Sequence, residues 1–146
     1  MNENETNLLT SLYQNCKTAT QSIHDIIPKV NDMQLLQELK IEYDIYLDFI
    51  GKCLSFAHKN NKCLPDNNYY EKVKLWTSIK MTTLINKSTR HLTEMLILGT
   101  VMGVLQCYKD LHDYDDANTE IVEMCQELLK IEEDNFSNLK SFLQKL

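Results

Sequence analysis

The stretch "RHLTEMLILGTVMGVLQCY", residues 90–108, is the most apolar in the chain, and it decides the fold class. Its longest uncharged run, residues 95–105, is about half of what a bilayer-spanning helix requires. The chain of 146 residues contains only three glycines and two prolines. Sandwiches, barrels and Rossmann-type sheets need many tight turns, so this scarcity argues against them. The sequence therefore predicts an all-α protein with this stretch as a central helix.

The composition is that of an ordinary globular domain, with 43% hydrophobic and 25% charged residues. We expect residues 1–146 to form a single domain with a substantial core. The formal net charge is -6, and lysine and arginine form no cluster of the kind that binds phosphates. We therefore expect neither nucleic acid nor a membrane as a partner. The N-terminal "MNENETN" is polar and acidic, unlike a signal peptide, so a cytoplasmic location is expected.

The five cysteines are odd in number, and no two of them have CxxC spacing. This pattern fits neither a disulfide framework nor a zinc site. Most of them fall within helical patterns, where a cysteine behaves as a small apolar residue. We expect reduced and buried thiols.

Apolar residues recur with a helical period in four long segments, which turn-forming residues separate. Pro28 ends the first segment, because the residue before a proline is disfavoured in helical geometry. Asn31 or Asp32 begins the second as its N-cap, and "NNKCLPDNN" and "HDYDDAN" form loops. The expected main helices cover residues 8–27, 31–59, 89–111 and 119–145, and a shorter helix covers residues 70–85.

The connection before the central helix decides the topology. One helix from residue 69 to residue 111 would exceed about 60 Å, against roughly 40 Å for the second helix. We therefore place a break at "NKST", with Ser88 or Thr89 as the next N-cap. A connection that returns along the bundle gives the order of ferritin-like folds, whereas one continuous helix gives a simple up-and-down bundle. We favour a ferritin-like up-down four-helix bundle with a short extra helix in the long second connection.

Polar residues that share an apolar stripe are the candidate functional residues. Glu42 lies on the stripe of the second helix and Glu132 on that of the last helix. Unpaired charges are almost never buried, because desolvating an ion costs several kcal/mol. The stripe of the central helix that is expected to face the core consists of His91, Glu94, Met95, Leu98, Val101, Met102 and Leu105.

Inward carboxylates and histidines in helix bundles house di-iron or di-manganese centres, which use Glu-x-x-His pairs on two helices. The candidate iron or manganese ligands are Glu42, His91, Glu94 and Glu132. The pairs are incomplete, since Asn135 occupies the place of a histidine after Glu132 and His91 precedes Glu94 in reverse order. A buried polar network, or an ion pair in the first turns of the central helix, explains the same residues without a metal. We favour this interpretation, and we identify no catalytic or cofactor-binding residue.

Gly99 and Gly103 lie four residues apart in the central helix. Glycine inside a helix destabilises it by close to 1 kcal/mol relative to alanine, so a compensating contact is expected. We favour close approach of a neighbouring helix within the bundle, with a dimer interface as the alternative. We expect the chain to form a homo-oligomer, most simply a dimer.

The segments "KSTRHLTEMLILGTVMG" and "LLKIEEDNFSNLKSFL", together with "IIPKV", resemble a family of small uncharacterised proteins from anaerobic Gram-positive bacteria. The resemblance covers residues 8–143 and implies a relative of the ferritin-like superfamily. Ferritin-like relatives imply iron chemistry, which depends on the Glu-x-x-His pairs that are incomplete here. Two hypotheses follow: a non-enzymatic, self-associating helical module with a degenerate metal site, or a carboxylate-bridged iron or manganese protein.

Overall fold

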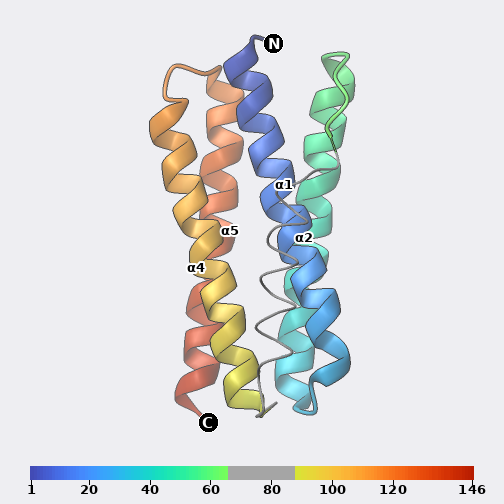
Figure 1. Ribbon diagram of the computed structural model, residues 1–146, viewed down its shortest axis with the longest axis vertical. Coiled ribbons are helices and arrows are strands. Elements are labelled where there is room, and N and C mark those ends of the chain that lie inside the picture. Colours follow the sequence, from blue (N-terminus) through green and yellow to red (C-terminus); the bar gives the residue numbers. More distant parts are fainter. Residues whose placement is uncertain (66–87) are drawn as a thin grey trace.

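The computed structural model describes residues 1–65 and 88–146. Within these ranges the chain forms four long helices and one short 3₁₀ helix, and no strand (Figure 1). These elements are α1 (Glu3–Ile26), η1 (Ile27–Lys29), α2 (Met33–Lys59), α4 (Thr89–Asp113) and α5 (Thr119–Gln144). The described residues confirm the prediction of an all-α helical bundle, while the helix expected over residues 70–85 lies outside them.

The helices form two antiparallel pairs, α1 with α2 and α4 with α5, and the pairs are joined mainly by α1 against α4. In Figure 1, α1 and α5 run from the top of the bundle to the bottom, whereas α2 and α4 run upward. Because α2 and α4 have the same direction, α2 ends at the end of the bundle opposite to that at which α4 begins. This direction is the one expected for a long second connection, and it differs from that of a simple up-and-down bundle.

Capping residues and a proline in the sequence explain where these helices begin and end. Ser88 is the N-cap of α4, and its side chain accepts a hydrogen bond from the backbone N–H of His91. This confirms Ser88, one of the two predicted N-caps, as the start of the central helix, while the expected end of the preceding helix lies outside the described residues. Asp32, one of the two predicted caps, begins α2 by accepting hydrogen bonds from two backbone N–H groups. Pro28 lies in η1, directly after the end of α1.

Three of the four helices bury the apolar stripes that their sequences predict. Leu8, Leu12 and Cys16 of α1 are fully buried, as are Leu35 and Leu39 of α2. The corresponding core residues of α5 are Ile121, Met124, Cys125, Leu128 and Leu139. All five cysteines of the chain are free thiols, and each except Cys63 is buried, largely as expected.

The predicted inward stripe of α4 is wrong, because this helix is turned the other way. Leu98, Met102 and Leu105 are 53%, 40% and 62% exposed. The buried face of α4 instead carries Leu92 and Leu96 near its start and then small or polar residues, among them Thr100 and Gly103. Packing explains the difference, since a Cβ added to Gly103 would lie 2.7 Å from Oε1 of Glu132. No large side chain fits where α4 approaches α5 so closely.

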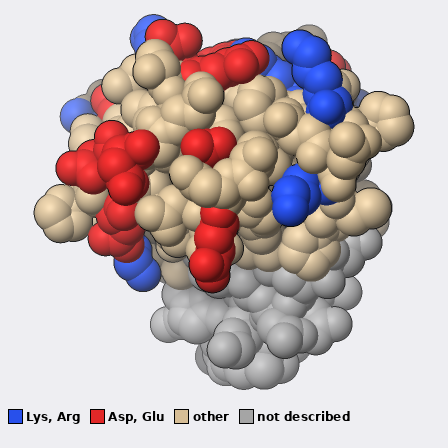
Figure 2. Space-filling view, turned by 90° about the horizontal axis from the view of Figure 1, so that it is seen from above, with Lys and Arg blue, Asp and Glu red and all other residues tan. Residues whose placement is uncertain are grey.

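Charge is divided at the end of the bundle where α1 begins. Acidic side chains gather on one side of this end and basic side chains on the other (Figure 2). The α4–α5 turn and the first turn of α5 supply Asp113, Asp115, Asp116 and Glu120, and the end of α2 supplies Lys59 and Lys62. None of the described helices is both long enough and apolar enough to cross a membrane.

Candidate functional site

A buried polar cluster occupies the centre of the bundle between α2 and α5. The Tyr46 hydroxyl donates a hydrogen bond of 2.8 Å to Oε2 of Glu132. Nδ2 of Asn135 donates in turn to the Tyr46 hydroxyl oxygen at 3.0 Å. All three side chains are almost fully buried, and so is Glu42, one helical turn before Tyr46. The polar network that the sequence favours is therefore present, built on Glu132 and joined by Tyr46.

Helical spacing and one glycine place these side chains. Glu132 and Asn135 are three residues apart on α5 and thus share a face. The carboxyl group of Glu132 lies against Gly103 of α4, where the lack of a side chain leaves room for it. Nδ2 of Asn15 donates to the carbonyl oxygen of Gly103 at 3.2 Å, so α1 also approaches α4 at this point. A close contact within the bundle is thus confirmed for Gly103, where side chains of neighbouring helices meet α4, but it is wrong for Gly99, which has no atom of the described residues within 4 Å of a Cβ position.

Oε1 of Glu132 is buried without a hydrogen-bond partner among the described residues, whereas the Glu42 carboxyl shares a hydrogen bond with the Glu38 carboxyl, one helical turn before it. Burial raises the pKa of Glu132 to about 8, although the hydrogen bond from Tyr46 acts in the opposite direction. Burial also raises the pKa of Glu42 to about 10, and the neighbouring Glu38 carboxyl adds to this shift. At neutral pH both carboxyl groups are therefore protonated and neutral, which is how a core without a cation can hold them.

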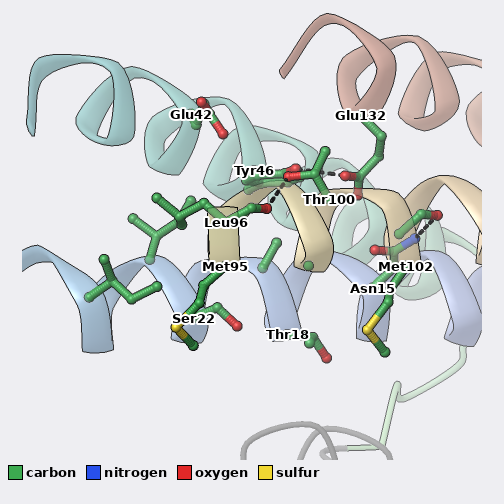
Figure 3. Close-up of a pocket in the computed structure, with 15 residues that line it drawn as sticks. Asn15, Thr18, Ser22, Glu42, Tyr46, Met95, Leu96, Thr100, Met102 and Glu132 are labelled. Atoms are coloured by element: carbon green, nitrogen blue, oxygen red, sulfur yellow. Dashed lines mark hydrogen bonds between the residues drawn. The ribbon is translucent and has the colours of Figure 1, made fainter. Parts of the chain in front are cut away.

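A cavity of about 70 Å³ adjoins these carboxyl groups. All four described helices line it, and both Glu42 and Glu132 do so (Figure 3). Its walls are largely apolar and include Ile23, Ile26 and Leu96. A further unpartnered buried oxygen, the hydroxyl of Thr18, belongs to the same lining.

His91 and Glu94 lie together, but away from this cluster. Nδ1 of His91 is 3.3 Å from Oε2 of Glu94, and Nε of Arg90 is 3.2 Å from its Oε1. The His91 and Glu94 side chains are 39% and 40% exposed, so they belong to the outer face of α4. Glu94 precedes Gly103 by nine residues, which is about 13 Å along the helix axis. Glu94 therefore cannot share a ligand position with Glu132, which lies against Gly103.

The four predicted metal ligands thus separate into two pairs, Glu42 with Glu132 in the core and His91 with Glu94 outside. Metal sites in helix bundles combine several carboxylates with histidines around one point. In residues 1–65 and 88–146, no three His, Cys, Asp or Glu side chains are grouped closely enough to hold a metal ion. The described residues therefore do not fit an iron or manganese centre built on these ligands.

The outer face of α4 is the second notable region. Its exposed apolar side chains recur at helical spacing and form one stripe: Leu98, Met102, Leu105 and Tyr108. Scattered exposed apolar residues are common, but a contiguous stripe along a helix is typical of an interaction surface. Charged residues continue the stripe beyond both of its ends, Glu94 before it and Lys109 after it.

Three contributors to the core cluster were not predicted. The hydroxyl of Tyr46 was assigned to the apolar stripe, although a buried tyrosine hydroxyl usually has a partner. Glu38 precedes Glu42 by one helical turn, and this spacing could have indicated that they are neighbours. Asn135 was recognised only as a missing histidine, whereas it supports Tyr46.

Comparison with known proteins provides no family or relative for this chain. No family model, no curated protein and no solved structure matches it. Its function must therefore be argued from the core cluster and from the outer face of α4.

Proposed function

We propose that the protein is a non-enzymatic helical module that self-associates, with two copies packing through the outer face of α4. The observation that carries this proposal is the exposed apolar stripe of α4, flanked by charges of opposite sign. Leu98 and Leu105 are both more than half exposed. Burial of one such side chain is worth roughly 1.5 to 3 kcal/mol, so covering the stripe provides a driving force for association.

A second copy fits this face when the two α4 helices run antiparallel. The point midway between Leu98 and Leu105 in the sequence lies between residues 101 and 102. Glu94 and Lys109 have the same midpoint. One two-fold axis at this midpoint brings Leu98 beside Leu105 of the second copy. The same axis brings Glu94 beside Lys109 of the second copy, because an isologous interface matches each pair twice. A parallel arrangement would instead place Glu94 beside Glu94 and Lys109 beside Lys109.

The chain order that we propose for this module is ferritin-like. The support is the common direction of α2 and α4, which is the helix order of ferritin-like folds. A cytoplasmic location is also part of the proposal, and five free cysteines are in keeping with a reducing compartment. We do not extend the proposal to iron or manganese chemistry, since His91 and Glu94 lie outside the core.

Charge reversal tests the antiparallel dimer. Glu94→Lys places lysine beside Lys109 of the second copy, so we expect the dimer dissociation constant to rise by about tenfold or more. The double variant Glu94→Lys/Lys109→Glu restores opposite charges and should recover the affinity. Analytical ultracentrifugation over a concentration series measures both constants. Glu123→Lys, which reverses an exposed charge on α5, is the matched control and should leave the constant unchanged.

Disulfide trapping tests the register, in a Cys63→Ser background that removes the one exposed thiol. A mixture of Leu98→Cys and Leu105→Cys chains should cross-link under mild oxidation, because a disulfide needs Cα atoms within about 7 Å. Each variant alone should cross-link poorly. A monomer at all concentrations would overturn self-association itself, whereas efficient cross-linking of Leu105→Cys with itself would overturn the antiparallel register.

A further inference from the structure

The core cavity reaches from the α1–α4 contact to the two buried carboxyl groups. Figure 3 shows Thr18 and Ser22 of α1 on one side of the cavity and Glu42 and Glu132 on the other. Met95, Gly99 and Met102 line it from α4. Gly99 and Met102 are also exposed to solvent, so the lining continues from the centre of the bundle to its surface.

The polar atoms of this cavity are unbalanced. Two of them are buried without a hydrogen-bond partner in the described part of the chain, the Thr18 hydroxyl and Oε1 of Glu132, whereas the Glu42 carboxyl shares a hydrogen bond with Glu38. Each unpartnered buried polar group destabilises the fold, because it has lost its hydrogen bonds to water without replacement. No lysine, arginine or histidine is found among the described residues of the lining. The cavity thus offers acceptors and acidic groups with no cation of the protein to match them.

We propose that this cavity binds a small organic ammonium ion, with its cationic head against Glu132 and its short alkyl chain along the apolar wall. Glu132 is 1% exposed, and its unpartnered oxygen belongs to the lining. An ammonium group carries three N–H donors and no acceptor, which complements an unpartnered carboxyl oxygen. The apolar wall favours an alkyl chain over a hydrated metal ion. This site is separate from the outer face of α4 and does not depend on the dimer.

Binding is coupled to proton release. In the free protein the buried carboxyl groups are protonated, because burial raises the pKa of Glu132 to about 8. The cation stabilises the carboxylate form, so the Glu132 proton leaves to solvent as the ammonium ion enters. The charge of the site stays constant, since one cation replaces one proton. A neutral ligand of the same shape releases no proton.

Isothermal titration calorimetry with n-butylammonium chloride tests the proposal, with n-butanol as the neutral isostere. Titration at pH 7 in two buffers with different ionisation enthalpies reports the protons released. We expect saturable binding of n-butylammonium with release of close to one proton per ion, and much weaker binding of n-butanol without release. Equal binding of the two ligands would show an apolar cavity without cation recognition and would overturn the proposal.

Variants locate the site. Glutamine has the shape of a neutral glutamic acid, so Glu132→Gln should fold. Its dissociation constant for n-butylammonium should be at least about tenfold higher than that of the wild type. Glu123→Gln, an exposed change on the same helix, should bind as the wild type does. Methyl-labelled methionine in NMR spectra supplies an independent readout: Met95 and Met102 should shift on binding, and the distant, exposed Met33 should not. Retained affinity in Glu132→Gln, or binding of manganese(II) with none of n-butylammonium, would overturn the proposal.

Discussion

The two faces of α4 differ, and beyond Leu96 the usual order of burial is reversed. Leu92 and Leu96 are buried near the start of the helix, but the rest of its inner face carries small or polar residues: Thr93, Thr100, Gly103, Cys107 and Asp110. Its outer face carries the large apolar residues: Leu98, Met102, Leu105 and Tyr108. Close packing at Gly103 excludes bulk from this part of the inner face, and the large side chains of the same turns occupy the side that no described helix covers.

The polar inner face is possible because its groups have partners nearby. The Thr100 hydroxyl donates to the carbonyl oxygen of Leu96 at 2.8 Å within the same helix. Asp110 accepts hydrogen bonds from Ser11 at 2.6 Å and from Gln106 at 3.0 Å. A buried polar group with a partner costs little free energy, whereas one without costs much more. Steric fit and hydrogen-bond satisfaction, rather than hydrophobicity alone, therefore determine the orientation of α4.

The largest difference between the two faces is expected in how the free energy of unfolding depends on pH. Glu132 lies against the inner face, with a pKa that rises from 4.5 to about 8 on folding. Between these values the unfolded chain loses this proton and the folded protein keeps it. The free energy of unfolding should therefore fall by about 1.4 kcal/mol per pH unit through this range, and by several kcal/mol in total. Glu42 contributes in the same direction up to about pH 10.

Urea denaturation at pH 5, 6, 7 and 8 measures this dependence. In Glu132→Gln the contribution of Glu132 is absent, so the difference in unfolding free energy between wild type and variant should change steadily with pH. An exposed acid such as Glu123 has no such environment, and Glu123→Gln should follow the wild type at each pH. Parallel curves for wild type and Glu132→Gln would mean that Glu132 is ionised in the folded protein, which would remove the reason for a neutral core.

The two glycines of α4 provide the next comparison. Alanine at Gly103 would place its Cβ 2.7 Å from the Glu132 carboxyl group, which Tyr46 holds in place. We expect Gly103→Ala to lower the free energy of unfolding by about 1 to 3 kcal/mol. A Cβ added to Gly99 would have no atom of the described helices within 4 Å. Gly99→Ala should therefore raise the free energy of unfolding by up to about 1 kcal/mol, because alanine has the higher helix propensity. Thermal and urea unfolding of the two variants should thus shift in opposite directions, and a shift in the same direction would contradict the close approach at Gly103.

Most of the fold could be predicted because its signals are local. Helix caps such as Ser88 and Asp32 depend on the few residues that follow them. The stripes of α1, α2 and α5 are apolar on one side only, so their orientation has a single solution. Glu42 and Glu132 were found for the same reason, since each interrupts a stripe that is otherwise apolar.

The orientation of α4 could not be predicted, because both of its faces are compatible with a core. Leucine and methionine on one face favour burial, and threonine, glycine and cysteine on the other face also tolerate it. The choice depends on Glu132, whose carboxyl group takes the space beside Gly103. That contact joins residues of two helices, and no local pattern encodes it. The wrong orientation placed His91 and Glu94 on the core side of α4, where they were candidate metal ligands beside Glu42 and Glu132.

The smallest effect concerns stability on the outer face, and it tests the orientation of α4 directly. Leu105 is 62% exposed and Leu96 is 7% exposed on the same helix. At concentrations where the protein is monomeric, Leu105→Ala should change the free energy of unfolding by less than about 0.5 kcal/mol. Leu96→Ala should lower it by about 2 to 4 kcal/mol, because it leaves a cavity against the neighbouring helices.

At higher concentrations, Leu105→Ala should also lose the extra stability that dimer formation confers, since association stabilises the folded state by mass action. Equal destabilisation by the two variants in the monomer would mean that the leucine stripe of α4 faces the core, and the proposed interface would then lose its apolar centre.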